Sequence, residues 1–293
     1  MTRLHIRAYL LAVLVLGGGG LAAAEPGFTQ FVEPKEKAFT ALVPQGWQSE
    51  GGIVRWSPEV AGAFNAAEAK VDFTLRSDAA GTRMMRWLPD IFFVDMSRSP
   101  AGPMFPPGSQ CNGCVVMPRI GGVEYLVKLV QPRIAAKGSD LKVVTQARVP
   151  AAEKAYDDLR AMLKIPVPLD YKAHLVLVEY TEGGTRFRQL MFVVIEDYGK
   201  VGVDLWKSRS TVVFRAPAAE FDAALPTFTK VQQSVQIDTG WLVKEMKAAA
   251  ERTGQVAGVF DDLRKLDADI VRNRTETNEA IQKQMQELLT QSR

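Results

Sequence analysis

Two cysteines three positions apart are the residues of this sequence with the clearest capacity for chemistry. They stand in Cys111-Asn112-Gly113-Cys114 and are the only two cysteines among 293 residues. Paired thiols at this spacing are the unit of thiol–disulfide exchange, but redox centres usually place the first thiol at a helix N-terminus, which lowers its pKa. Asn-Gly favours a tight turn instead. Because the ends of such a turn lie within disulfide reach, the sequence predicts a structural disulfide.

Two other roles for the thiol pair stay open. A redox-active Cys111/Cys114 pair would make the chain a thiol–disulfide oxidoreductase, and free thiols could bind a soft metal. Histidine, the other common metal ligand, occurs only as His5 and His174. A multi-histidine metal site therefore cannot be built, and we expect neither a metal nor a cofactor.

A long segment rich in aromatic residues and proline could provide a binding surface. Residues 84–118 show no regular periodicity, which indicates an insertion without its own elements. If this loop is exposed, it presents an apolar patch for a peptide, a lipid or a partner protein. In the alternative, its aromatic rings fold back over the sheet. The candidate residues of this apolar binding loop are Trp87, Phe92, Phe93, Met104 and Phe105.

Candidates for acid–base chemistry are few. Asp90 and Asp95 lie in the same segment, and paired carboxylates can serve hydrolysis, although solvated turn carboxylates are far commoner. His174 lies on an alternating segment, on the same face as Val176 and Val178. The chain has no G-x-S-x-G elbow, no phosphate-binding loop and no dinucleotide fingerprint. We therefore assign no catalytic residue, and a hydrolase ranks behind the thiol–disulfide oxidoreductase as an enzyme hypothesis.

The elements that must position these residues are strands in antiparallel pairs, with helices between the pairs. Val71, Phe73 and Leu75 alternate with polar residues, which is the period of a strand with one buried face. This order predicts an α+β fold in which helices cover an antiparallel sheet. Strands are expected over 39–43, 53–56, 69–75, 141–149, 172–180, 186–197 and 203–215, and helices over 122–131, over 151–164 and as two short helices divided by Pro226.

The last part of the chain predicts a long amphipathic helix. Residues 241–293 contain no proline, and residues 238–293 are interpreted as a C-terminal helical tail. The tail has an apolar seam, which would either dock on its own domain or pair with a partner or a second copy as a coiled coil. The seam residues are Val256, Phe260, Leu263, Leu266 and Ile270.

The first residues indicate export. Arg3 and Arg7 precede the apolar run 8–16, and small residues at 22–24 form a cleavage site. We therefore predict a signal peptide over 1–24 and a short lead-in over 25–38, with no transmembrane anchor in the mature chain. The mature protein would be periplasmic or secreted.

Charge argues against nucleic acid as a partner. The whole chain has 36 Lys+Arg against 33 Asp+Glu. Without Arg3 and Arg7 the difference is 34 − 33 = +1. A chain so close to neutral lacks the excess of basic residues that binds the phosphate backbone of a nucleic acid.

Two motifs that bracket the central region carry a resemblance to a known family. They are Phe39-x4-Pro44-x-Gly46-Trp47 and Phe221-x4-Pro226-x-Phe228. With the antiparallel strands between them, residues 39–237 resemble the PsbP-like α/β/α sandwich family. That family includes photosystem oxygen-evolving subunits, a Ran-binding nuclear import factor, and periplasmic lipoproteins and secretion chaperones of bacteria.

The resemblance implies an antiparallel sheet covered by helices on both sides, and a role in binding or assembly without catalysis. The chain departs from the family in segment 84–118, helix 151–164 and the tail, so no partner-binding residue is transferred. We therefore expect an exported, non-enzymatic binding or assembly module that recognises a protein partner, with self-association through the tail as one form. The alternative is the Cys111/Cys114 oxidoreductase.

Overall fold

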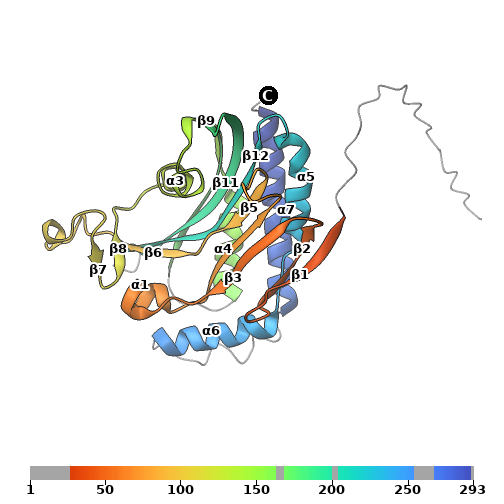
Figure 1. Cartoon of the computed structure of the whole chain (residues 1–293). Coiled ribbons are helices and arrows are strands. Elements are labelled where there is room, and N and C mark those ends of the chain that lie inside the picture. The colour runs from red at the N-terminus through yellow and green to blue at the C-terminus, as the bar shows by residue number, and fades with distance from the viewer. Residues whose placement is uncertain (1–26, 163–167, 200–203, 254–266, 292–293) are drawn as a thin grey trace, which may run out of the picture.

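A large antiparallel sheet forms the centre of the computed structural model, which describes residues 27–162, 168–199, 204–253 and 267–291 (Figure 1). Its strands follow the order β3-β4-β5-β12-β11-β10-β9, and β6, β7 and β8 extend it beside β12. Only the pairing of β6 with β8 is parallel among the described pairs. The strands are β3 (Gln48–Val54), β4 (Lys70–Arg76), β5 (Met84–Trp87), β6 (Ile91–Val94), β7 (Gln110–Cys111), β8 (Cys114–Val116), β9 (Ser139–Arg148), β10 (Asp170–Glu182), β11 (Thr185–Asp197) and β12 (Leu205–Pro217).

The strands predicted over 172–180 and 186–197 are confirmed, and they form the antiparallel hairpin of β10 and β11. Its two-residue loop is Gly183-Gly184, and both glycines have positive φ, 56° and 77°. Such angles suit the tight turns whose twist matches that of the strands. Along β10, Leu175 and Leu177 enter one apolar cluster and Val176 enters the other. Both faces of this strand are therefore buried, which requires helices on both sides of the sheet.

One face of the sheet is covered by α4 (Pro150–Met162), α5 (Phe221–Ser234) and α7 (Asp267–Gln291). A second sheet packs on the same core, with β2 (Phe39–Pro44) between β1 (Phe28–Val32) and β13 (Gln236–Ile237). The prediction that Pro226 divides two helices is wrong, because α5 continues through it. Burial of Phe221, Phe228 and Val231 against the sheet outweighs the backbone hydrogen bond that proline cannot make.

The other face is covered by one continuous helical segment. It consists of α2 (Gly122–Tyr125), the π-helical turn η2 (Leu126–Val130) and α3 (Gln131–Ile134). Tyr125, Leu126 and Val130 pack on the sheet from this segment. The sequence predicts a helix ending before Pro132, but the helix runs to Ile134, with the widened turn next to the proline. The observed architecture is thus α+β, an antiparallel sheet with helices on both faces.

Segment 84–118 was expected to lack elements of its own, and this expectation is wrong. It supplies β5 and β6 to the sheet and forms the small hairpin β7–β8. The strands are only two to four residues long, too short to show a period in the sequence. The 3-10 turn η1 (Gly102–Met104) separates β6 from the hairpin.

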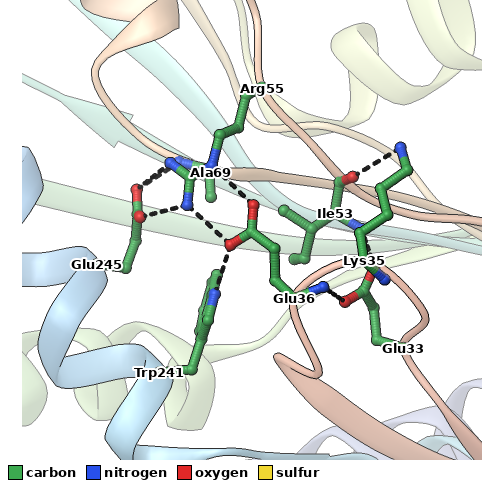
Figure 2. Close-up of polar contacts among 8 residues, drawn as sticks. All are labelled: Glu33, Lys35, Glu36, Ile53, Arg55, Ala69, Trp241 and Glu245. Atoms are coloured by element: carbon green, nitrogen blue, oxygen red, sulfur yellow. Dashed lines mark hydrogen bonds and ion pairs between the residues drawn. The ribbon is translucent and has the colours of Figure 1, made fainter.

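A polar network joins α6 (Thr239–Thr253) to the rest of the molecule (Figure 2). Arg55 lies between two carboxylates, 2.7 Å from Glu36 and 2.7 Å from Glu245. The Trp241 indole donates to Glu36 at 2.7 Å, and the Ala69 amide donates to Glu245 at 2.8 Å. We call Glu36, Arg55, Trp241 and Glu245 the tail network. It fixes α6 across the lead-in and across the ends of β3 and β4.

The end of the tail docks on its own domain. Met285, Leu288 and Leu289 of α7 are buried in the same core as α4 and α5. Among the predicted seam residues, Val256, Phe260, Leu263 and Leu266 lie outside the described residues, and Ile270 lies in α7. In the part of the chain that the structure describes, no helix is long and apolar enough to cross a membrane. The predicted signal peptide also lies outside that part.

Strand β9 ends the sheet on the side away from β3. It pairs with β10 alone among the described strands, and this pairing has two register irregularities. Asp140, near its start, has a left-handed backbone with φ of 54°. The edge strand is therefore bent rather than straight.

Candidate binding groove

A groove with a volume of about 310 Å³ lies beside helix α1 (Pro58–Ala66). The hairpin strand β8 and the η2–α3 helix form its other walls, and β6 lies at its base. We call it the α1 groove. Its lining is mainly apolar, as small-molecule and peptide sites usually are. The apolar lining includes Trp56, Val60, Ile91, Val115, Met117 and Leu129.

Glycines determine how α1 meets the hairpin. Gly62 interrupts α1 with φ of 76°, and Asn112 and Gly113 form the left-handed turn of the hairpin, with φ of 50° and 76°. A Cβ on Gly62 would lie 2.2 Å from the Asn112 oxygen, and one on Gly113 would lie 2.3 Å from the Gly62 nitrogen. The two backbones therefore touch, with no room for a side chain at either glycine.

Asn65 fastens α1 to the sheet. Its side chain is buried, accepts a hydrogen bond from the Phe92 amide at 2.8 Å and donates to the Phe92 carbonyl at 3.2 Å. The Asn65 amide nitrogen also lies 3.7 Å from the Cys114 sulfur. One asparagine thus connects the helix, β6 and the hairpin. The sequence gives no signal for this role, because the three segments are distant along the chain.

The rim of the groove combines an exposed apolar side chain with the cation of Arg133. Val60 lines the groove and is 76% exposed. Phe64 of the same nine-residue helix is 45% exposed but is not among the lining residues. The Phe64 ring lies against Phe92, with 5.8 Å between ring centroids. Arg133 of α3 also lines the groove and is exposed, and it has no ion pair with any described residue. The groove therefore offers apolar contact beside a positive charge.

Behind Phe92 lies a cluster of charged side chains. Lys207 is completely buried, forms an ion pair with Glu68 and lies 3.8 Å from Asp90. Arg209 joins Asp90 at 3.5 Å and Glu196 at 2.6 Å. The lysine cluster, as we call it, consists of Glu68, Lys70, Asp90, Glu196, Lys207 and Arg209. Its cations come from β4 and β12, so only the folded sheet brings them together.

Lys70 is the unusual member of the lysine cluster. It is buried, and its ammonium has no hydrogen-bond partner among the described residues. The ammonium lies 5.7 Å from the ring centroids of Trp56 and Phe92. Burial, reinforced by repulsion from Lys207, lowers the pKa of Lys70 to about 8. The aromatic rings offset only part of the lost hydration.

The carboxylates of the cluster are held in their charged form. Burial alone would raise the pKa of Glu68, but attraction to Lys207 and Arg209 outweighs it and lowers this pKa to about 2. The pKa of Glu196 is lowered in the same way, since attraction to Arg209 and Lys207 exceeds the effect of burial. Neither group is suited to donate a proton near neutral pH. The cluster is therefore built to hold charge in place.

The predicted structural disulfide is not formed in the structure, where Cys111 and Cys114 are free thiols. The Cys114 sulfur is buried against Asn65 rather than joined to Cys111. Burial raises the pKa of Cys114, and electrostatic repulsion from Cys111 raises it further. Cys111 lies in a hairpin strand rather than at a helix N-terminus, where redox-active thiols usually stand, so the geometry does not favour the oxidoreductase alternative. Among the described residues, no His, Cys, Asp and Glu side chains are grouped to hold a metal.

The candidate residues of the apolar loop do not form one surface. Phe92 and Phe93 are buried, and Trp87 packs on the core. Met104 is exposed, whereas Phe105 lines a second cavity of about 280 Å³, between η1 and β8. The rings thus fold back over the sheet, and the apolar rim comes from α1, a helix that the sequence interpretation did not contain.

The acid–base candidates lie in separate environments. Asp95 accepts the amides of Ser97 at 2.9 Å and Arg119 at 3.0 Å, and these bonds lower its pKa although burial opposes them. Asp90 belongs to the lysine cluster and accepts the Ser210 amide at 3.0 Å. His174 packs beside Gly122, and burial lowers its pKa. These three residues have no shared site.

Comparison with known proteins gives a fold likeness and no family assignment. No family model matches the chain, and no curated protein matches it. Among solved structures, the solution structure of cyanobacterial PsbP (CyanoP) from Synechocystis sp. PCC 6803 matches 76% of this chain and 99% of its own, at 10% identity and a TM-score of 0.26. This weak likeness is to the family that the two sequence motifs resemble.

Proposed function

We propose that this chain is an exported, non-enzymatic binding module that recognises a protein partner through the α1 groove. The observation that carries the proposal is the exposed apolar side chain of Val60, which lines a mainly apolar groove of about 310 Å³. Exposed apolar side chains gathered at a cavity mark interaction sites more often than isolated ones do. The predicted signal peptide supports a partner in the cell envelope or outside the cell.

The groove also supports a specific kind of occupant. Arg133 is an exposed cation without an ion pair among the described residues, and it lines the same groove as the apolar residues. A peptide segment with an apolar side chain next to a carboxylate would fill the groove and pair with this arginine. Such a charge-assisted contact fixes register and raises specificity.

The test places a photo-crosslinker on the rim of the groove. A benzophenone amino acid replaces Val60, and as a control it replaces Lys154 on the exposed side of α4. The native envelope fraction is irradiated, and adducts are identified by mass. We expect one discrete protein at position 60 that is absent at position 154. The same adducts at both positions, or no adduct, would contradict the proposal.

Binding of the purified partner then separates recognition from chance contact. We expect Val60→Asp and Arg133→Glu each to weaken the affinity by about tenfold or more, equivalent to about 1.4 kcal/mol. Lys154→Glu is the matched control and should leave the affinity unchanged. If all three variants bind as the unmodified chain does, the α1 groove is not the recognition site.

A further inference from the structure

The β7–β8 hairpin brings its two thiols to positions from which they can join. Cys111 and Cys114 are directly opposite one another and flank the Asn112-Gly113 turn. Opposed residues of antiparallel strands have Cα atoms about 4.5–5.5 Å apart and side chains on the same face. A disulfide needs about 4.4–6.8 Å between its Cα atoms. The pairing of the hairpin is therefore compatible with both the free thiols and the bridge.

The same hairpin determines the position of α1. The Asn112-Gly113 turn lies in backbone contact with Gly62 of α1, with no space for a side chain at either glycine. The buried Cys114 sulfur faces Asn65 of α1, and a bridge to Cys111 would draw it away from the Asn65 amide. Any change at this turn is therefore passed to α1, which supplies Val60 and Ala61 to the groove.

From these contacts we propose that Cys111 and Cys114 form a reversible disulfide that displaces α1 and so changes the α1 groove. The two thiols act as a modification site, and α1 is the element that responds. The effect on partner binding rests on the proposed function of the groove, whereas the movement of α1 does not.

The reaction needs an oxidant, and a low-molecular-weight disulfide such as oxidised glutathione provides it. The thiolate of Cys111, which is the more exposed, attacks the glutathione disulfide and releases one glutathione thiol. Cys114 then attacks the Cys111 sulfur of the mixed disulfide and releases the second. Two protein thiols are oxidised, and one glutathione disulfide is reduced to two thiols that carry the two protons. An excess of reduced thiol reverses both steps.

The environment of Cys114 favours a slow switch over a catalyst. Its thiol is buried and its pKa is raised, so only a small fraction is thiolate and its attack on a disulfide is slow. Such a thiol would make repeated catalytic turnover slow. A single, lasting conversion between the reduced pair and the disulfide does not need to be fast. This distinguishes the proposal from the oxidoreductase alternative.

Hydrogen exchange of the full mature chain tests the switch. The reduced protein is treated with oxidised glutathione, the thiols are counted with Ellman's reagent, and amide exchange is followed over residues 58–66. We expect two free thiols to fall to none. Exchange in α1 should then become about tenfold faster, because Asn65 loses its sulfur contact. Cys111→Ser is the matched control, since it keeps Cys114 beside Asn65 and cannot form the bridge; its α1 exchange should not respond to the oxidant.

Two results would overturn the proposal. Either the thiols resist oxidised glutathione, or the bridge forms while exchange over residues 58–66 stays within twofold of that in the reduced chain. Because neither readout needs a partner, failure of the proposed function is seen separately. If α1 responds and no partner crosslinks at position 60, the switch stands and the partner proposal fails.

Discussion

The tail network and the lysine cluster are built from the same kinds of residue but differ in their access to water. In the tail network, the Arg55 side chain is 45% exposed and is bonded to two carboxylates. In the lysine cluster, Lys207 is fully buried, and Lys70 beside it has no hydrogen-bond acceptor among the described residues. Exposed ion pairs contribute about 0–1 kcal/mol, whereas removing one partner from a buried pair costs about 3–5 kcal/mol. Ion pairs of similar geometry are therefore expected to contribute different amounts to the free energy of unfolding in the two regions.

The largest expected effect comes from removing the tail. A chain ending at Ile237 loses Trp241 and Glu245 of the tail network, and it loses Met285 and Leu288 of the core. We expect its cooperative thermal transition to disappear, because apolar burial by α7, more than the charged contacts of α6, holds the tail. Differential scanning calorimetry of the mature chain and the shortened chain measures this.

Single changes show which part of the tail matters. Leu288→Ala should lower the free energy of unfolding by about 2–5 kcal/mol, since it leaves a cavity in a packed core. Glu245→Gln, the control within the tail network, should change it by less than about 1 kcal/mol. A larger loss for Glu245→Gln than for Leu288→Ala would reverse this account of the tail.

The next largest effect is expected at Lys207. Lys207→Ala removes the cation that lies against Glu68 and Asp90, and we expect a loss of about 3 kcal/mol, near the lower limit because Glu68 is 38% exposed. Urea unfolding measures the loss. Lys154→Ala removes an exposed lysine that pairs with Asp158, and should change stability by less than about 0.5 kcal/mol. Equal losses for the two variants would show that burial does not set the energetic weight of these charges.

Lys70 should behave in the opposite way from Lys207. Its ammonium has no acceptor among the described residues, so Lys70→Met should be neutral or stabilising by about 1 kcal/mol at pH 7. The pKa of Lys70 is about 8 in the folded chain against an ordinary 10.5. Between these values the unfolded chain binds more protons, so the contribution of Lys70 to stability rises with pH.

A pH series of urea unfolding isolates this contribution of Lys70. The stability of the unmodified chain relative to Lys70→Met should increase from pH 8 to pH 10.5 and stay constant below pH 7. If the difference is flat over the whole range, the ammonium is better solvated than its burial indicates.

The smallest effect is expected in the tail network, where the Arg55 side chain is 45% exposed. Arg55→Ala removes both ion pairs of Arg55, yet we expect a loss of less than about 1 kcal/mol. The tryptophan fluorescence of the Arg55→Ala variant should nevertheless change, because Glu36, which pairs with Arg55, also accepts a hydrogen bond from the Trp241 indole. A loss above 2 kcal/mol in urea unfolding would place the tail network on a level with the lysine cluster.

Much of the fold could be predicted from the sequence because the long elements have clear periods. The strands around 172–180, 186–197 and 203–215 and the helix at 151–164 correspond to β10, β11, β12 and α4. Short strands cannot show a period, and β5, β6 and β8 were missed for that reason. At Pro226, tertiary packing outweighed a local preference, which a sequence pattern does not weigh.

The candidate site was harder to predict than the fold. The Asn-Gly turn between the cysteines was predicted from local chemistry and is present. The partner of that turn, Gly62, is a glycine some fifty positions away, and no pattern links the two. Lys70 and Lys207 are ordinary lysines in the sequence. The pairing of β6 with β12 places Lys207 beside Phe92, and Lys70 approaches the same ring from β4.

The bent edge strand β9 has a consequence for the behaviour of the protein at high concentration. A free strand edge offers unpaired backbone donors and acceptors to other chains, and Leu141 and Val143 add exposed apolar side chains there. The two register irregularities and the left-handed Asp140 interrupt this edge, so a second copy cannot add a long, regular strand to it. The irregularity of β9 thus protects a large open sheet from growing into aggregates.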